Sequence, residues 1–394
     1  MVSHGTASDP GSAREPARSG AAGPFEHRMD RVRAAMVERE VDVLLLSVGP
    51  DLPWLAGYEA MPLERLTMLV VPVDGDPTLV VPRLEAPRVV ERPGVFGLRA
   101  FGETDDPVRL VAELVGSGAS TARLAVGDRT WARFVVDLQA ELPGARWSRA
   151  STVTGPLRAL KEPGEIEALR AAGEAADRVA AQLQCGEIGL VGRTEAEVSA
   201  DLGARLLAEG HQRVNFAIVA SGPNAASPHH EPGDRVIAPG DLVLCDFGGT
   251  MFTADGVGYC SDITRCVSVG EPPSEVADAY AILHEAQEAA VEAATLGTAC
   301  EEVDAVARRI ITAAGFGDRF IHRTGHGIGV EEHEDPYIVV GNAAPLEAGN
   351  AFSVEPGIYT ERRWGLRLED IVVATPDGPD PLNTVDHALV VVDG

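Results

Sequence analysis

The sequence predicts an α+β protein of two domains, in which the larger, second domain is built from two similar halves. The chain has 394 residues, which is more than a single hydrophobic core usually serves. Short apolar runs alternate with amphipathic runs up to about residue 157, and beyond it a pattern of two helices followed by strands occurs twice. We therefore expect a disordered tail at 1–23, an α/β domain at 24–157 and the larger domain at 158–394.

Composition restricts the partners and the location. With 33 Lys and Arg against 60 Asp and Glu, the formal net charge of −27 argues against nucleic acid and anionic membranes as partners. Residues 1–23 lack the apolar segment of a secretory signal, and no uncharged apolar run approaches the ~18 residues that cross a bilayer. The five cysteines form no Cys-x-x-Cys pair, so we expect reduced packing residues in a cytoplasmic protein.

The first domain reads as alternating strands and helices without a catalytic motif. Val- and Leu-rich runs bounded by Pro, Gly or Asp predict strands at 41–48, 67–73, 78–84 and 123–127. Amphipathic runs predict helices at 25–38, 107–115 and 130–142. There is no Gly-rich phosphate loop, and the one histidine, His27, is expected on a helix surface. Catalysis is not expected in this domain.

The second domain is predicted to begin near Lys161, where Pro163 suits the first turn of a helix. Apolar residues at intervals of three or four predict a long helix from there to about 183 and a second from about 194 to 209. Strands are expected at 214–220, 242–247 and 259–269. After Pro272 the same order returns, with a long helix, a second helix at about 301–314, and strands.

This repeat can be aligned residue by residue. Setting Gly192 on Gly297 gives six identities in nineteen positions at an offset of 105, which is weak alone because Ala, Glu and Gly are common here. Polar residues further along strengthen it, at offsets of 104, 109 and 107: His229 with His333, Asp246 with Glu355, and Asp262 with Glu369. Two similar halves would bring these pairs together around a pseudo-two-fold axis.

The polar residues of the repeat predict a metal centre. The candidate ligands share short apolar or Gly-rich surroundings, where a buried carboxylate is costly without a cation: Asp246, Asp262, His326, Glu355 and Glu369. Four carboxylates carry about four negative charges, which two divalent cations would balance. Two cations about 3.5–4 Å apart would lower the pKa of a bridging water toward about 7. Oxygen-rich ligation favours Mn²⁺, with Co²⁺, Fe²⁺ or Zn²⁺ as alternatives.

These motifs are similar to those of a known family. Residues from about 158 onward resemble the pita-bread metallopeptidases, and among them prolidase and aminopeptidase P, to which methionine aminopeptidase and creatinase are related. The first domain is similar to their creatinase-type domain, most visibly in Asp51-Leu-Pro-Trp-Leu-Ala-Gly-Tyr. The ligand motifs stand in the family's order, with 7 residues from His326 to His333, 29 from His326 to Glu355 and 14 from Glu355 to Glu369. The resemblance implies a pita-bread fold behind a creatinase-like domain, and a homodimer.

The resemblance also implies a role for each ligand. Asp246 and Glu369 resemble the carboxylates that bridge two metals, and Asp262 resembles the one that chelates the first metal. His326 and Glu355 resemble the ligands of the second metal, and Glu355 also resembles the residue that handles the proton of the nucleophile.

Four further residues receive roles in the same way. His229 and His333 resemble the pair that steadies the substrate carbonyl and the tetrahedral intermediate. His322 resembles a histidine that contacts substrate, although an ordinary hydrogen-bonded histidine is an equal alternative. Arg367 resembles a substrate-binding arginine beside the last metal ligand. His230 is given no role.

Each motif alone has a more ordinary explanation. Asp246 and Asp262 would read as turn residues or helix caps, and Glu355-Pro-Gly as a turn after a strand. The Gly-His-Gly-Ile-Gly around His326 looks superficially like a phosphate loop, but no Lys-Ser or Lys-Thr follows it. The joint occurrence of five motifs at matching spacing is what favours the metal site.

One spacing departs from the family pattern. Asp246 and Asp262 are 16 residues apart, five more than the family usually shows. We expect the extra residues in a longer loop at 250–255 between the two strands that carry these aspartates. Asp255 could replace Asp246 only if that loop folded inward, and the Asp-Phe-Gly context favours Asp246.

The function predicted is that of a dinuclear-metal exopeptidase that hydrolyses the bond between an N-terminal residue and a following proline. The length of the chain favours an Xaa-Pro dipeptidase (prolidase) over an Xaa-Pro aminopeptidase. A dipeptidase must capture the free proline carboxylate, for which Arg362, Arg363 and Arg367 are candidates. The alternatives are a creatinase-like or ectoine-hydrolase-like hydrolase of amide or amidine bonds and a non-catalytic peptide-binding module. Retention of all five ligands argues against the creatinase-like hydrolase and against the binding module.

Overall fold

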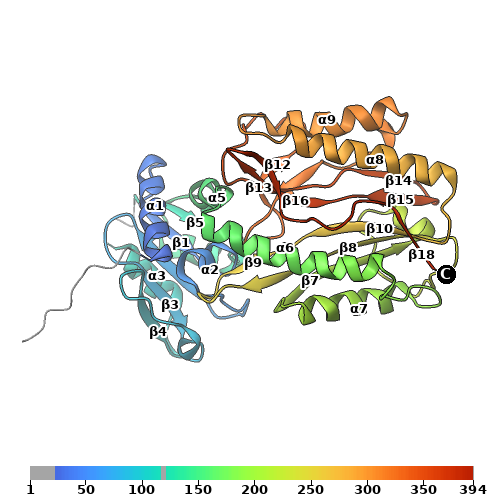
Figure 1. The fold of residues 1–394 in the computed structure, drawn as a ribbon. Helices are drawn as coiled ribbons and strands as arrows, with labels where there is room; N and C mark the ends of the chain where they lie inside the picture. The colour runs from blue at the N-terminus through green and yellow to red at the C-terminus, as the bar shows by residue number, and fades with distance from the viewer. Residues whose placement is uncertain (1–22, 117–120, 394) are drawn as a thin grey trace, which may run out of the picture.

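The computed structural model describes residues 23–116 and 121–393, so the tail predicted at 1–23 lies outside the described residues except for Gly23. Its first part is a six-stranded sheet in the order β4-β3-β2-β1-β5-β6, flanked by short helices (Figure 1). The strands are β1 (Val43–Leu46), β2 (Met68–Pro72), β3 (Thr78–Pro82), β4 (Gly97–Phe101), β5 (Arg123–Val126) and β6 (Arg146–Arg149). The helices are α1 (Pro24–Glu38), α2 (Asp51–Ala56), η1 (Ala86–Arg88), α3 (Pro107–Val115), α4 (Ala132–Glu141) and α5 (Ser151–Ala159).

The elements that the sequence did not predict are the short or polar ones. Strand β6 has the sequence Arg-Trp-Ser-Arg and lies at the edge of the sheet with no buried residue, so it lacks an apolar pattern. Strand β4, at the other edge, buries only Phe101 among its side chains. Tertiary pairing therefore decides these two strands, because little in their own side chains favours an extended chain.

The second part consists of two halves with the same order of elements. The first half contains α6 (Pro163–Gln184), α7 (Glu195–Ala208), β7 (Arg213–Ser221), η2 (Gly222–Ala226), β8 (Leu242–Phe252), β9 (Gly258–Cys260) and β10 (Ile263–Val269). The second contains α8 (Ser274–Ala293), α9 (Cys300–Ala313), η3 (Gly317–Arg319), β11 (Gly325–Gly327), β12 (Glu334–Ile338), β13 (Ala351–Val354), β14 (Gly357–Thr360), β15 (Trp364–Arg367), β16 (Asp370–Thr375), β17 (Gly378–Pro381) and β18 (Val390–Val392). The helix pairs predicted from the apolar periodicity are thus observed in both halves.

Each half forms most of its own sheet, and β18 of the second half joins the sheet of the first. One has the order β18-β10-β8-β7, with β9 paired to β8, and the other the order β12-β11-β13-β16-β17; β14 and β15 form a separate pair. In Figure 1 the helices α6 and α7 lie along the first sheet, and α8 and α9 along the second. Apolar side chains of each helix pair pack with those of their own sheet, as Val179 and Leu202 do with Phe247, and Leu283 and Val303 with Phe352.

Half of the loop expected at 250–255 is strand, because β8 includes residues 250–252, so this prediction is wrong in detail. Strand β8 continues to Phe252 and pairs with β9, in the register Met251 with Tyr259. The extra residues therefore lengthen a hairpin, whose turn includes Asp255. This turn points to the first domain, where Arg92 Nη2 donates to the Asp255 carbonyl oxygen at 2.7 Å. Asp255 cannot take the place of Asp246 in this arrangement.

Buried charges connect the first domain to the second. Arg158, at the end of α5, is 7% exposed and binds Asp51 at 2.9 Å, Glu331 at 2.6 Å and Glu334. Lys161 Nζ lies 2.8 Å from the other oxygen of Glu334. Burial opposes the charge of Arg158, but the three carboxylates outweigh it and raise the pKa of the guanidinium. We name Asp51, Arg158, Lys161, Glu331 and Glu334 the junction network.

No helix in the described part of the chain combines the length and the apolar character needed to span a membrane.

Candidate metal centre

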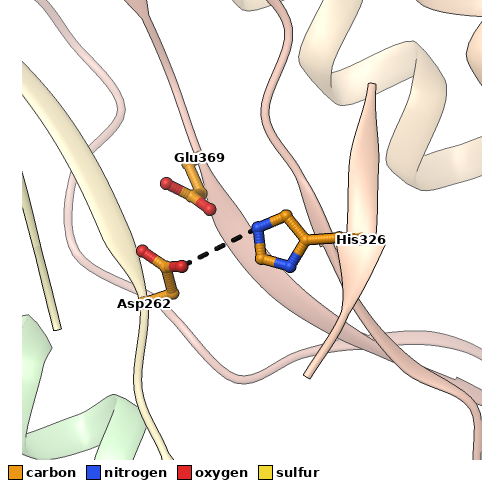
Figure 2. Close-up of side chains that lie close together, drawn as sticks. All are labelled: Asp262, His326 and Glu369. Carbon is orange, nitrogen blue, oxygen red and sulfur yellow. Dashed lines mark ion pairs between the residues drawn. The ribbon is translucent and has the colours of Figure 1, made fainter. Parts of the chain in front are cut away.

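Three of the predicted ligands come together between the two sheets. Ligand atoms of Asp262, His326 and Glu369 all lie within 4.8 Å of one another, and all three residues are buried. Figure 2 shows the carboxylates of Asp262 and Glu369 facing the same side of the His326 imidazole. Asp262 lies where the strand expected at 259–269 is interrupted between β9 and β10, and Glu369 immediately precedes β16. Thr264 and Glu369 form an isolated bridge that joins the first half to the second.

Glycines explain how the strand that carries His326 fits into its sheet. A Cβ atom at Gly325 would lie 1.8 Å from the Ser353 carbonyl oxygen, and one at Gly327 would lie 2.4 Å from Asp335. Only glycine permits β11 to approach its neighbours this closely. The Gly-His-Gly sequence is therefore a packing requirement that leaves the imidazole as the one side chain of β11.

Hydrogen bonds fix the His326 ring for ligation. Nδ1 lies 3.2 Å from the Gly327 carbonyl oxygen, so the proton belongs on Nδ1 and Nε2 offers its lone pair to the cavity. Nε2 lies 3.1 Å from Glu355 Oε1 and 3.9 Å from Asp262 Oδ2. Three acceptor atoms at these separations repel one another unless a cation lies among them.

Asp246 and Glu355 complete the predicted set on the wall of the same cavity. Asp246 Oδ2 accepts a hydrogen bond from Arg367 Nη2 at 2.5 Å, whereas its Oδ1 is buried and has no partner in the part of the chain that the structure describes. Glu355 Oε1 accepts from Ser353 Oγ at 3.1 Å. A buried carboxylate oxygen without a donor is costly. The orphaned Oδ1 therefore supports a cation at this position.

The electrostatics lead to the same conclusion. Burial raises the pKa of Asp262 and of Glu369 well above the ordinary range, and the neighbouring carboxylates raise it further. When all four carboxyl groups are ionised, as ligation requires, Arg367 offsets one negative charge and three remain for the cation to balance. These donors fit one or two divalent cations.

A cavity of about 840 Å³ adjoins the donors. All six residues of the three predicted pairs line it: His229, Asp246, Asp262, His333, Glu355 and Glu369. The ring of His333 stacks on that of His326 with centroids 3.8 Å apart. Burial lowers the pKa of His333 to about 4, so that it is neutral at neutral pH. A neutral imidazole can still donate one N–H to a substrate carbonyl.

Every side-chain nitrogen of His322 and of Arg367 already has a hydrogen-bond partner within the protein, which a substrate-contacting role does not require. Arg367 Nη1 donates to Tyr359 Oη at 2.8 Å, and that oxygen lies 2.9 Å from His322 Nε2. His322 Nδ1 lies 2.7 Å from the Arg323 carbonyl oxygen. The tautomer that satisfies this chain protonates Nδ1 and lets Tyr359 donate to Nε2. Burial lowers the pKa of His322, which agrees with a neutral ring.

The substrate-binding role predicted for Arg367 is not supported by its contacts. Its three guanidinium nitrogens already donate, Nε to Thr264 Oγ1 at 3.1 Å, Nη1 to Tyr359 and Nη2 to Asp246. Arg362 and Arg363 pair with Glu361 and Glu275 and are not among the residues that line the cavity. None of the three arginines proposed for the proline carboxylate is placed to bind it.

Two other arginines line the cavity together with Arg367, and the sequence did not single them out. Arg129, from the loop after β5 of the first domain, forms an ion pair with Glu331. The Arg323 guanidinium lies 4.4 Å from the centre of the Tyr337 ring and has no ion-pair partner within the described ranges. Single arginines in loops belong to no spacing pattern, and so only the fold could identify them.

Comparison with known proteins agrees with this geometry. Residues 167–376 match the model of Metallopeptidase family M24, and residues 28–160 match that of the Creatinase/Prolidase N-terminal domain. A protein named "Probable dipeptidase PepE" from Mycobacterium tuberculosis is 45% identical over 371 residues, which cover 93% of this chain and 96% of that protein. An Xaa-Pro dipeptidase from Lactobacillus helveticus is 36% identical over 373 residues, covering 92% and 98%.

A solved structure shares the whole arrangement of the two domains. The recombinant prolidase from Thermococcus sibiricus superposes with a TM-score of 0.88 at 34% identity and covers 94% of this chain and 100% of its own. The pita-bread fold and the creatinase-like first domain that the sequence predicted are thereby confirmed. With both the sequence models and the superposed fold in agreement, this chain belongs to metallopeptidase family M24.

Proposed function

We propose that this metallopeptidase is an Xaa-Pro dipeptidase that uses two divalent cations, with Mn²⁺ as the favoured metal. The observation that carries the proposal is the set of five oxygen and nitrogen donors on one wall of a cavity that also presents His229, His322 and His333. Relatives named as dipeptidases and prolidases along nearly the whole chain support the substrate class. Oxygen-dominated ligation supports manganese, with cobalt, iron or zinc as alternatives.

The residues of the cavity divide the work of hydrolysis. Divalent cations bound at the five donors would polarise the substrate carbonyl and activate a water. Glu355 takes the proton of the attacking water and delivers it to the proline nitrogen as the peptide bond breaks. Neutral His333 donates a hydrogen bond to the oxygen on which negative charge develops, and His229 faces the same cavity from the other half. Arg367 keeps Asp246 oriented throughout.

Arg323 is the side chain we propose for capture of the proline carboxylate. It is the cavity arginine without an ion pair among the residues that the structure describes, and its guanidinium carbon lies 4.4 Å from the centre of the Tyr337 ring. A guanidinium can bind a carboxylate through two parallel hydrogen bonds. Such an anchor selects a substrate that ends at the proline, which is what distinguishes a dipeptidase from an aminopeptidase.

The reaction class is tested by a panel of substrates. Metal-depleted protein is incubated with and without Mn²⁺ or Co²⁺, with an Xaa-Pro dipeptide, an Xaa-Pro-Xaa tripeptide and creatine, and products are followed by chromatography. We expect metal-dependent cleavage of the dipeptide, slower cleavage of the tripeptide and none of creatine. Absence of peptide cleavage with either metal would refute the proposal. Cleavage of creatine instead would favour the creatinase-like alternative.

The carboxylate anchor is tested with Ala-Pro and its C-terminal amide, which lacks the negative charge. In Arg323→Met we expect KM for Ala-Pro to rise about 10- to 100-fold, the size of a hydrogen bond to a charged group, while KM for the amide changes less than about twofold. Arg362→Met is the matched control, because its side chain is 90% exposed and lies outside the cavity lining. Equal rises in KM for the acid and the amide would show that Arg323 does not read the carboxylate.

Two properties expected from the sequence stay predictions. They are the homodimer and the cytoplasmic location, and sedimentation and cell fractionation measure them directly.

A further inference from the structure

The residues on both sides of His229 form hydrogen bonds to the rest of the protein, whereas the His229 ring forms none among the described residues. Its imidazole lines the cavity and makes no hydrogen bond to any residue that the structure describes. A catalytic side chain without a partner of its own must take its direction from the backbone that carries it. The contacts of Pro228 and His230 therefore decide where the His229 ring points.

The residue before His229 is tied to the metal centre. The Pro228 carbonyl oxygen accepts a hydrogen bond from Arg367 Nη1 at 3.3 Å. The same guanidinium binds Asp246, one of the predicted ligands, through Nη2. Arg367 thus connects the backbone at Pro228 to the proposed metal ligand Asp246.

The residue after His229 is tied to the core. His230 Nε2 lies 2.7 Å from Glu195 Oε2, and Glu195, the first residue of α7, is 0% exposed. Glu195 Oε1 also accepts from the backbone N–H of Ser221 at 2.8 Å and from its hydroxyl at 2.7 Å. Asn224 Nδ2 lies 3.1 Å from both oxygens, and the Gly233 N–H lies 3.4 Å from Oε2. One buried carboxylate therefore holds both ends of the segment 221–233.

Burial alone would favour a neutral Glu195, but these donors outweigh it and lower the pKa of the carboxyl group. The carboxylate is thus ionised at neutral pH, and each of its hydrogen bonds to the segment is charge-assisted.

We propose that Glu195 and His230 form a positioning pair that aims the His229 imidazole into the cavity, so that His230 acts only through His229. The inference rests on the proposed function, in which His229 stabilises the reacting carbonyl. It assigns to the double histidine Pro228-His229-His230 a division of labour, with one ring directed to the substrate and the other to the core. Neither Glu195 nor His230 lines the cavity, so neither touches the substrate.

The second half of the chain offers a counterpart that supports this assignment. His333 is followed by Glu334, which Lys161 and Arg158 hold in the junction network. Both histidines of the predicted catalytic pair are therefore followed by a residue that is anchored by a buried charge. The buried partner is a carboxylate for His230 and two cations for Glu334, so the two halves share the position of the contact and not its chemistry.

The test is a double-mutant cycle in the metal-loaded enzyme, measured with Ala-Pro. We expect His229→Ala to lower kcat about 100-fold or more, as loss of an oxyanion donor does. His230→Ala and Glu195→Gln should each lower kcat about 10- to 100-fold through misplacement of His229, with metal content unchanged. The decisive variant is His229→Ala combined with His230→Ala, which should be no slower than His229→Ala alone.

Two further variants separate positioning from general damage. His230→Gln places an N–H donor the same number of bonds from Cβ and should recover most of the activity. Glu197→Gln is the matched control, because Glu197 lies in the same helical turn as Glu195, but its carboxylate accepts hydrogen bonds from Thr194 alone among the described residues. Additive losses in the double variant, or full activity of His230→Ala, would overturn the inference.

A second measurement keeps the inference decidable if the wild-type enzyme cleaves no peptide, a result that would count against the proposed function alone. Hydrogen exchange of the metal-free protein, read by mass spectrometry, should become faster in the segment 221–233 for Glu195→Gln and His230→Ala. Glu197→Gln should leave that segment unchanged. Unchanged exchange in the first two variants would overturn the positioning pair irrespective of activity.

Discussion

Replacement of Glu369 by alanine is expected to abolish metal binding and to lower kcat on the order of 10⁴-fold, which corresponds to about 5 kcal/mol of transition-state stabilisation. Glu369 is 1% exposed, and its carboxylate lies with Asp262 and His326 in the closest group of donors. Thr264 Oγ1 donates to Glu369 Oε2 at 2.7 Å, which fixes the carboxylate for ligation. Metal content after dialysis and steady-state cleavage of Ala-Pro measure the two effects.

The controls for this variant separate loss of a ligand from loss of the fold. Glu369→Gln keeps the shape and removes the charge, and it should lose metal as the alanine variant does. Glu361→Ala should retain full metal content, because the Glu361 side chain is 88% exposed. If Glu369→Ala binds as much metal as the wild type, the assignment of Glu369 as a ligand is wrong.

The second large effect is expected on stability, from Arg158→Met at the junction between the domains. The change leaves the buried carboxylates of Asp51, Glu331 and Glu334 without the cation that they share. Removing one partner of a buried ion pair costs about 3–5 kcal/mol, because the remaining charge is uncompensated. We expect the midpoint of urea unfolding, followed by tryptophan fluorescence, to fall accordingly.

Second-site changes test whether charge is the cause. Adding Asp51→Asn to Arg158→Met removes the carboxylate that pairs with no other cation among the described residues, and it should restore part of the stability. Arg158→Lys keeps the charge but cannot reach several carboxylates at once, so it should be intermediate. If Arg158→Met unfolds at the wild-type midpoint, the junction network contributes nothing to stability.

The parts of the site that could be predicted from the sequence are those with a local signature. His326 lies between glycines, and the structure shows why, because β11 tolerates no Cβ beside it. Asp246, Asp262, Glu355 and Glu369 lie on buried strands or directly beside them, where isolated acids are conspicuous among apolar residues. Such patterns survive in a linear sequence because each depends on its immediate neighbours.

The parts that could not be predicted depend on partners far along the chain. The direction of His230 is set by Glu195, 35 residues earlier, and nothing near His230 reveals it. Arg129 reaches the cavity only because the first domain packs against the second. A loop was expected at 250–255 to hold the extra residues between Asp246 and Asp262, and the strand pairing that extends β8 to Phe252 has no signature in these residues.

The five proposed metal ligands are divided between the two halves of the second domain. Asp246 and Asp262 belong to the first half, and His326, Glu355 and Glu369 to the second. Strand β18, from the end of the chain, pairs in parallel with β10 of the first half and ties the halves a second time. A fragment that contained either half alone would carry an incomplete coordination sphere. Bound metal is therefore an internal reporter of docking between the halves, as in complementation between two pieces of a split enzyme.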